Sequence, residues 1–168
     1  MDEIIHQLSE KGLSDQIALM RWREIHDEKL RSILSETVWV RGEMTRLEVE
    51  SQVDLVAVEK SSEPNAYLRV LAVYSIKVSL RERFQQDLFW AEKLRSRGMR
   101  FCFITLDRDG VLLKAALEGK LTSKQAKMAA ALYDRVYLLT DREITHHSRV
   151  FRRLEDLQVD LELWLRSS

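Results

Sequence analysis

The sequence has few of the residues that shape disulfide-rich, collagen-like or linker-rich chains. Its 168 residues include one cysteine, one proline and five glycines. A single cysteine excludes an intrachain disulfide framework and a cysteine-based zinc site. The low proline and glycine content excludes collagen-like and low-complexity chains. No uncharged apolar run approaches the roughly 18 residues that a membrane helix needs.

The sequence has no excess of charge of either sign, because 27 basic residues balance 27 acidic ones. A strongly basic surface would indicate nucleic-acid binding, but a neutral total does not exclude DNA, since local patches matter more than the sum. The hydrophobic content of 45% predicts one globular domain over residues 1–168 with a real core. Residues 1–16 are polar and acidic rather than a secretory signal, so we expect a cytoplasmic protein without membrane contact.

Hydrophobic periodicity predicts alternating helices and strands. The expected elements are a helix at residues 15–35, strands at 37–50, 52–59 and 67–77, a helix beginning at Ser79, a strand at 101–106, a helix at 122–134, a strand at 136–139 and one or two helices at 143–165. Gly98 stands where the helix from Ser79 should stop. This order predicts an α/β fold with a mixed central sheet, in which an antiparallel meander is followed by crossover strands flanked by helices.

One aspartate and one lysine interrupt the two most apolar strands. If these strands turn at Asn65-Ala66, residues whose numbers sum to about 131 lie opposite each other, which pairs Asp54 with Lys77. Ser75 lies two residues before Lys77 and therefore shares its face of the sheet. We expect the two charged side chains to meet, because an unpaired charge in an apolar strand is costly.

Two interpretations of this pair remain open on the residues alone. The first is a salt bridge at the open end of a hairpin. The second is a divalent-metal site for phosphodiester hydrolysis, since magnesium prefers hard oxygen ligands and keeps several of its waters. A metal ion polarises the phosphate, and a lysine beside it can orient the attacking water and offset charge in the transition state.

The residues that follow Lys77 carry a family resemblance. The strand ends Ser75-Ile76-Lys77 and leads after Val78 into Ser79–Arg83, with the sequence SLRER. Together with Asp54, these segments resemble the PD-(D/E)XK nuclease superfamily, and more narrowly type II restriction endonucleases with a Ser-x-Lys strand and a Ser-Leu-Arg-Glu-Arg helix. The specific similarity covers residues 53–92. It implies a restriction-endonuclease-like core and a Mg²⁺-dependent DNA endonuclease, in which Mn²⁺ can substitute.

The resemblance also implies roles for single residues. Asp54 would bind metal together with the backbone carbonyl of Ile76, and Lys77 would be the catalytic lysine. Ser75 stands where many members carry Asp or Glu, so the second acid must come from elsewhere. On the helix after the lysine strand the candidates are Glu82, which could instead close a capping box with Ser79, and Glu92, which could be an ordinary solvated charge. On the first expected helix they are Glu24 and Glu28, which could equally belong to its solvent-facing side.

DNA contacts are expected at the start of the helix that follows the lysine strand. Free backbone N–H groups at a helix N-terminus form an anion site. Arg81 and Arg83 would contact phosphate there, together with Ser79 and Gln86, although surface arginines need no such role.

Partners and alternatives follow from the length of the chain. The expected elements leave little room for a separate DNA-reading domain, so specificity for double-stranded DNA would need loops, a homodimer or a larger specificity subunit. In the last case the chain would be a small catalytic subunit. An alternative is a nuclease-fold binding module that has lost the reaction, which Ser75 in place of an acid favours. A repair, homing or junction-resolving nuclease is a further alternative.

Overall fold

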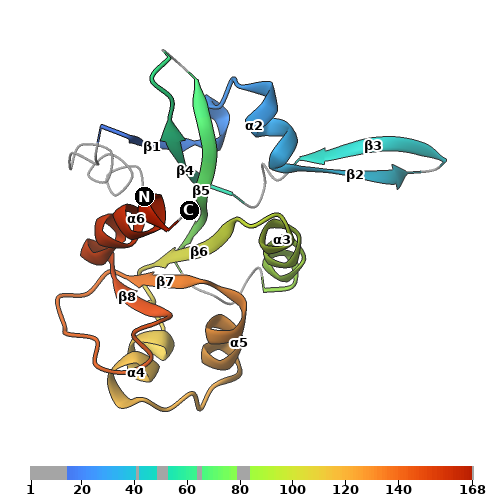
Figure 1. Cartoon of the computed structure of the whole chain (residues 1–168). Coiled ribbons are helices and arrows are strands. Elements are labelled where there is room, and N and C mark those ends of the chain that lie inside the picture. Colours follow the sequence, from blue (N-terminus) through green and yellow to red (C-terminus); the bar gives the residue numbers. More distant parts are fainter. Residues whose placement is uncertain (1–14, 41, 49–52, 64–65, 79–83, 168) are drawn as a thin grey trace.

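The chain folds around a six-stranded mixed β-sheet with helices on both faces (Figure 1). The computed structural model describes residues 15–40, 42–48, 53–63, 66–78 and 84–167. Pairing is antiparallel between β1, β4 and β5 and parallel from β5 to β8. The sheet therefore confirms the expected α/β class. In spatial order its strands are β1 (Ile17–Arg21), β4 (Leu55–Lys60), β5 (Tyr67–Lys77), β6 (Arg100–Thr105), β7 (Arg135–Leu138) and β8 (Phe151–Arg153).

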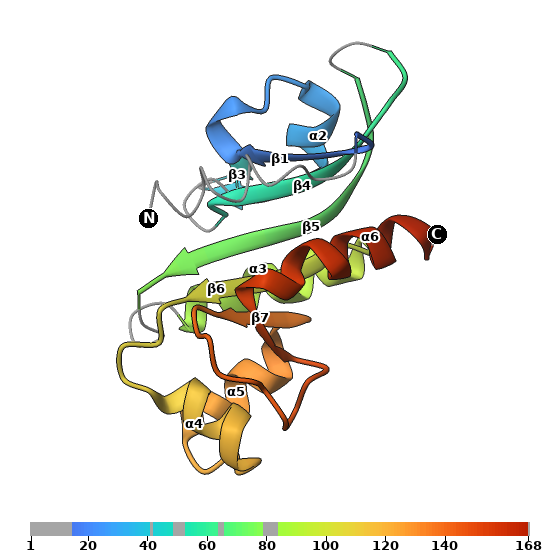
Figure 2. The same cartoon turned by 90° about the vertical axis from the view of Figure 1, so that its left-hand side faces the viewer.

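Helices cover the two faces unequally, as Figure 2 shows with α6 in front of the sheet and α3 behind it. Side chains of α2, α3, α4 and α5 form one buried cluster with one face, and α6 packs on the other. No helix in the described part of the chain is long and apolar enough to cross a membrane. The helices of the described residues are η1 (Trp22–Glu24), α2 (Glu28–Ile33), α3 (Phe84–Ser96), α4 (Val111–Glu118), α5 (Lys124–Leu132), η3 (Leu154–Asp156) and α6 (Leu157–Arg166).

The central strand β6 confirms the expectation for the apolar run at 101–106. Phe101 and Phe103 pack into the cluster below α3 and α5, whereas Cys102 and Ile104 pack into the cluster below α6. A parallel strand buried on both faces has no polar side to display, so its sequence is continuously apolar. The expected strand at 136–139 is likewise confirmed as β7.

The β4–β5 hairpin forms as expected, but its register differs from the expected one. Leu55 lies opposite Tyr74, so extending the pairing by one residue places Asp54 opposite Ser75 rather than Lys77. The connection is wider than a tight turn, since Ser61 N donates to Ala66 O, and Asn65 lies outside the described residues. Two irregularities in the ladder shift the pairing further. A two-residue shift preserves the face of every side chain, so Asp54 and Lys77 remain on the same side.

The helix expected at residues 15–35 is wrong. Residues 17–21 instead form the edge strand β1 along β4, the short η1 follows it, and an α-helix begins only after Asp27. Asp27 Oδ1 accepts a hydrogen bond from Leu30 N at 3.1 Å, which starts a new helix at that point. Helical spacing of apolar residues was the only signal for one long helix, and pairing with β4 overrides that weak preference.

The strand expected at 37–50 is a hairpin instead. β2 (Ser35–Val40) pairs with β3 (Glu43–Glu48) in a separate two-stranded sheet that projects from the body in Figure 1. Val40 lies opposite Glu43, and Gly42 has a φ of +87°. A connection this short needs positive φ, which glycine adopts without strain.

Two further expectations along the second half need correction. Helix α4 was not expected, because Gly110 rather than a Ser, Thr, Asn or Asp stands at its N-cap. The segment 143–165, expected as one or two helices, instead holds the strand β8 followed by η3 and α6. By contrast, α5 confirms the helix expected at 122–134, and α3 ends before Gly98, whose φ is +77°. The start expected for α3 at Ser79 lies outside the described residues.

Candidate active site

The Asp54–Lys77 pair lies at one end of the sheet. Asp54 directly precedes β4 and Lys77 is the last residue of β5, so the antiparallel pairing brings them to the same edge. Lys77 Nζ lies 2.7 Å from Asp54 Oδ2. The side chains are 23% and 36% exposed respectively, so the pair borders solvent rather than the core. The contact that the sequence predicted is therefore present.

The backbone of the lysine strand fixes the carboxylate of Asp54. Ile76 N donates to Asp54 Oδ2 at 2.7 Å, and Asp54 N donates to Tyr74 O at 2.9 Å. Oδ1 receives no hydrogen bond from any described residue. One carboxylate oxygen is thus used to hold the geometry, and the other remains available to a ligand.

Ser75 is fully buried on the same face as Lys77. Its exposed fraction is 0%, and its Oγ has no hydrogen-bond partner among the described residues. On the neighbouring strand it lies beside Phe103. A neutral hydroxyl supplies no negative charge, so Ser75 offers no carboxylate to a metal ion at this place.

Thr105 and Asp107 hold the strand next to Lys77, and sequence reasoning missed both. Thr105 is the register partner of Lys77 on β6. Its Oγ1 donates to Val78 O at 3.4 Å and accepts from Asp107 N at 3.0 Å. Asp107 Oδ2 in turn accepts from Leu112 N and Leu113 N at the start of α4. Burial raises the pKa of Asp107 above its ordinary value. The hydrogen bonds that its carboxylate accepts from backbone N–H groups lower the pKa, but by less.

A buried polar pair anchors the first turn of α3. Tyr133 Oη donates to Asp87 Oδ2 at 2.6 Å, and Asp87 is 2% exposed. The ring of Tyr133 stacks on Phe101 and Phe103 with centroid distances of 5.5 and 5.0 Å. Burial, followed by the charge of Asp87, raises the pKa of Tyr133 far above its ordinary value, so its hydroxyl stays a donor. This pair fixes the helix that follows the lysine strand.

Among the described residues, none of the acids proposed as second ligands forms a hydrogen bond or ion pair with Asp54 or Lys77. Glu92 is exposed and lines a groove of about 410 Å³ between α3 and α5. Glu24 Oε2 accepts from Arg21 N, and Glu28 is exposed at the start of α2. Ser79, Arg81, Glu82 and Arg83 are not among the described residues, and neither is the side chain of Gln86. Within the described ranges no three His, Cys, Asp or Glu residues form a metal-binding cluster.

The donors that the structure describes fit a hard divalent cation that keeps most of its waters. They are the free Asp54 oxygen and the carbonyl of Ile76, one residue before Lys77 on β5. Magnesium is commonly held by one or two carboxylates and completed by water and substrate phosphate. Soft metals are not favoured, because Cys102 is buried in the sheet.

Comparison with known proteins places the chain in a family. The model for BsaWI restriction endonuclease type 2 matches residues 31–160, which include Asp54, Ser75 and Lys77. The chain belongs to this family. Its fold is that of a restriction endonuclease. The family in general uses divalent metal ions, which agrees with the oxygen donors at the sheet edge. No curated protein matches the chain.

A solved structure described as a pre-specific restriction endonuclease BsaWI–DNA complex has the same fold. The TM-score is 0.57 at 14% sequence identity, and the alignment covers 98% of this chain and 61% of that chain. The chain therefore spans about three fifths of the length of that protein. At this identity the likeness concerns the fold.

Proposed function

We propose that the chain is a metal-dependent endodeoxyribonuclease of the restriction type, with a PD-(D/E)XK-like site formed by Asp54, Ser75 and Lys77. The observation that carries the proposal is the 2.7 Å contact between Lys77 Nζ and Asp54 Oδ2 at an open sheet edge. Its support is that both residues lie within the segment matched by the restriction endonuclease family.

Each residue of the pair has a distinct task in phosphodiester hydrolysis. Asp54 and the Ile76 carbonyl would hold Mg²⁺ or Mn²⁺, which supplies a Lewis acid for the phosphate and makes bound water more acidic. Lys77 donates hydrogen bonds to the attacking water and to the phosphoryl oxygens, where negative charge develops. Water adds to phosphorus and the P–O ester bond to the leaving oxygen breaks. One proton of the water ends on that oxygen, and the other stays with the hydroxyl of the new phosphate monoester. Asp54 Oδ2 keeps the ammonium in place through the reaction.

The second metal-binding acid belongs to the same proposal. Because Ser75 is neutral and buried, we assign the role to the segment after the lysine strand, with Glu82 before Glu92 and with Glu24 and Glu28 behind them. Loss of a carboxylate ligand lowers the affinity of the site for the metal ion, so cleavage then needs a higher ion concentration. Glu82→Gln should therefore raise the Mg²⁺ concentration for half-maximal cleavage, whereas Glu92→Gln should leave it unchanged. The opposite pattern would exchange their roles.

Double-stranded DNA is the proposed substrate, with Arg81, Arg83, Ser79 and Gln86 as phosphate contacts. Specificity then needs a homodimer or a larger specificity subunit beside this chain. Site-specific double-strand cuts by the isolated chain, measured at concentrations where it is monomeric, would exclude both arrangements.

A plasmid-nicking assay with Mg²⁺ or Mn²⁺ tests the proposed activity. Lys77→Ala and Asp54→Asn should each lower the cleavage rate by about 10²–10⁴-fold, the usual effect of losing a catalytic group. Lys60→Ala is the matched control, because Lys60 is an exposed lysine at the other end of the same hairpin. Equal background cleavage in all variants, with folding intact by circular dichroism, would favour a nuclease-fold binding module without activity.

A further inference from the structure

Basic side chains on the sheet and α3 are largely neutralised by acids. Four of the pairs join residues at least ten positions apart, and the other two are local contacts within the β8–η3 segment. The pairs are Arg69–Glu59, Lys77–Asp54, Arg95–Asp134, Arg135–Asp160, Arg152–Asp156 and Arg153–Glu155. The balanced net charge of the chain is thus also balanced locally over most of this surface.

The α4–α5 region departs from this pattern. Lys114, Lys120, Lys124 and Lys127 are all exposed, and none has a carboxylate partner among the described residues. From Val111 to Tyr133 the sequence carries these four lysines and a single acid, Glu118. We call the four residues the α4–α5 lysine cluster. Within these limits four lysines against one glutamate leave an excess of three positive charges, in a chain of zero net charge.

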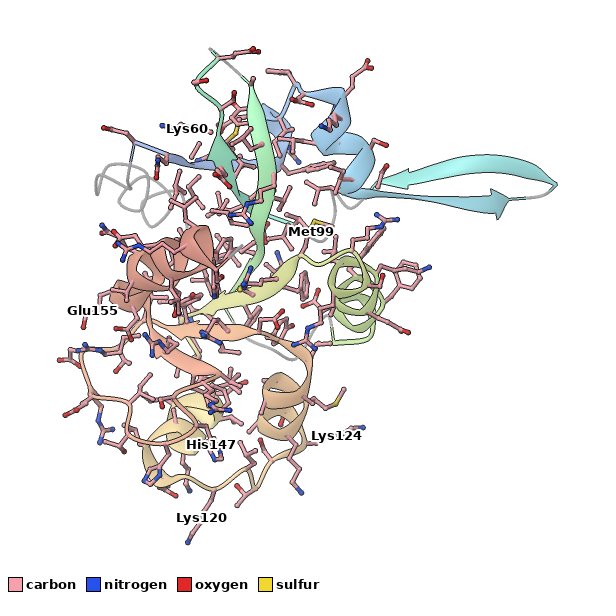
Figure 3. The ribbon with its side chains drawn as sticks, in the orientation of Figure 1. Lys60, Met99, Lys120, Lys124, His147 and Glu155 are labelled. Atoms are coloured by element: carbon pink, nitrogen blue, oxygen red, sulfur yellow. The ribbon has the colours of Figure 1, made fainter. Side chains whose placement is uncertain are left out.

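The cluster is connected to the edge that carries the candidate active site. Thr105, the register partner of Lys77, ends β6, and the chain then enters α4 at Val111. Helices α4 and α5 pack on the same face of the sheet as α3. Figure 3 shows Lys120 and Lys124 pointing away from the body at the end of the molecule that α4 and α5 form. A long polyanion bound at the sheet edge could extend along this end.

We propose that the α4–α5 lysine cluster binds the phosphate backbone of duplex DNA outside the catalytic site. This inference rests on the proposed function and adds a second contact surface to it. Lysine ammonium groups act as mobile point charges that attract phosphate without reading sequence. The cluster therefore contributes affinity, salt dependence and attraction of the duplex, and leaves sequence choice to other residues.

Salt-dependent DNA binding tests the cluster. The dissociation constant for a mixed-sequence duplex of about 30 base pairs, roughly three helical turns, is measured over a series of NaCl concentrations without divalent cations. Lys120→Gln/Lys124→Gln is compared with Lys29→Gln/Lys60→Gln, which removes two exposed lysines from α2 and β4. All four lysines are exposed, so both variants should fold like the parent.

We expect the cluster variant to bind more weakly and with a less steep salt dependence. The slope of log K against log salt should fall by about 0.9 per lost phosphate contact, or about 1.8 for the pair. The control variant should keep the slope of the parent. Equal slopes for the parent and the cluster variant, or equal losses in both variants, would overturn the inference. A parent that does not bind duplex DNA at all would instead overturn the proposed function.

Discussion

Single residues at the sheet edge differ in how far the sequence revealed them. Asp54 and Lys77 could be predicted because each interrupts an apolar strand, and a charge at such a place needs a partner. The expected register was wrong by two residues, but both side chains still lie on the expected face of the sheet, because side-chain direction alternates with a period of two. Thr105 and Asp107 could not be predicted in the same way. Their importance depends on the register between β5 and β6, which lie on either side of α3 in the sequence.

Thr105 gives a prediction for positioning of the lysine strand. Thr105→Val keeps the shape but removes the hydroxyl that joins Val78 O and Asp107 N. The cleavage rate at saturating DNA should fall about fivefold to tenfold, the effect of about 1 kcal/mol. Thr105→Ser should restore the rate, and KM should change little in either variant. A loss that serine does not rescue would show that packing, rather than the hydroxyl, is what matters.

Asp107 gives a prediction for the pH dependence of stability. Its folded-state pKa is raised by burial, so the folded chain holds this proton more tightly than the unfolded chain. The stability it contributes is full below the unfolded pKa and is lost as pH rises through the folded pKa. Asp107→Asn can still accept from Leu112 N through its amide oxygen but does not titrate. Relative to the parent, this variant should therefore gain stability between pH 3 and pH 7 in urea unfolding. A constant difference over that range would contradict the raised pKa.

Among the elements, those with a clear apolar pattern were predicted best. β6 is buried on both faces and β7 lies beside it, and both formed where expected. The helix expected at 15–35 failed because the edge of β4 offered residues 17–21 a pairing partner that no local pattern reveals. α4 was missed because its capping carboxylate, Asp107, stands before the Gly110 N-cap rather than at it.

Helix α6 gives a prediction about a buried charge. Asp160 is 2% exposed and accepts hydrogen bonds from Tyr137 Oη at 2.9 Å and from Arg135 Nε at 3.1 Å. Asp160→Ala leaves the guanidinium of Arg135 without this partner, so it should lower the free energy of unfolding by about 3 kcal/mol. Glu162→Ala on the same helix should change it by less than about 0.5 kcal/mol. Similar effects of the two variants in urea unfolding would show that Asp160 does not anchor α6.

At the scale of the whole molecule, two parts differ in how they are stabilised. The six-stranded sheet is covered on both faces, whereas β2 and β3 form a two-stranded sheet of their own. The base of this hairpin is held by Arg97, whose Nη1 donates to Ile33 O and Ser35 O at 2.7 Å. The sequence indicated β structure here but gave no sign that it would form separately. A single glycine at position 42 was the only turn signal.

Hydrogen exchange should therefore divide the molecule into two parts. A two-stranded hairpin is marginally stable in water, so the amides of β2 and β3 should exchange through local opening. The amides of β5 and β6 should exchange only on global unfolding, because these strands lie inside the sheet. Mass spectrometry of the exchanged peptides measures both. Protection of β2–β3 equal to that of β6 would show that another surface covers the hairpin. If protection rose on adding duplex DNA, that surface would be DNA.

The central claim is that Asp54 and Lys77 form a metal-assisted site for cutting DNA. Its most direct test is a crystal structure of the chain with duplex DNA and Mn²⁺, located by its anomalous scattering. We predict an ion within coordination distance of an Asp54 oxygen, about 2.1 Å, with a backbone phosphate on its other side and Lys77 Nζ facing the same phosphate. An ion and phosphate bound away from this edge, with the Asp54–Lys77 contact intact and facing only solvent, would contradict the claim.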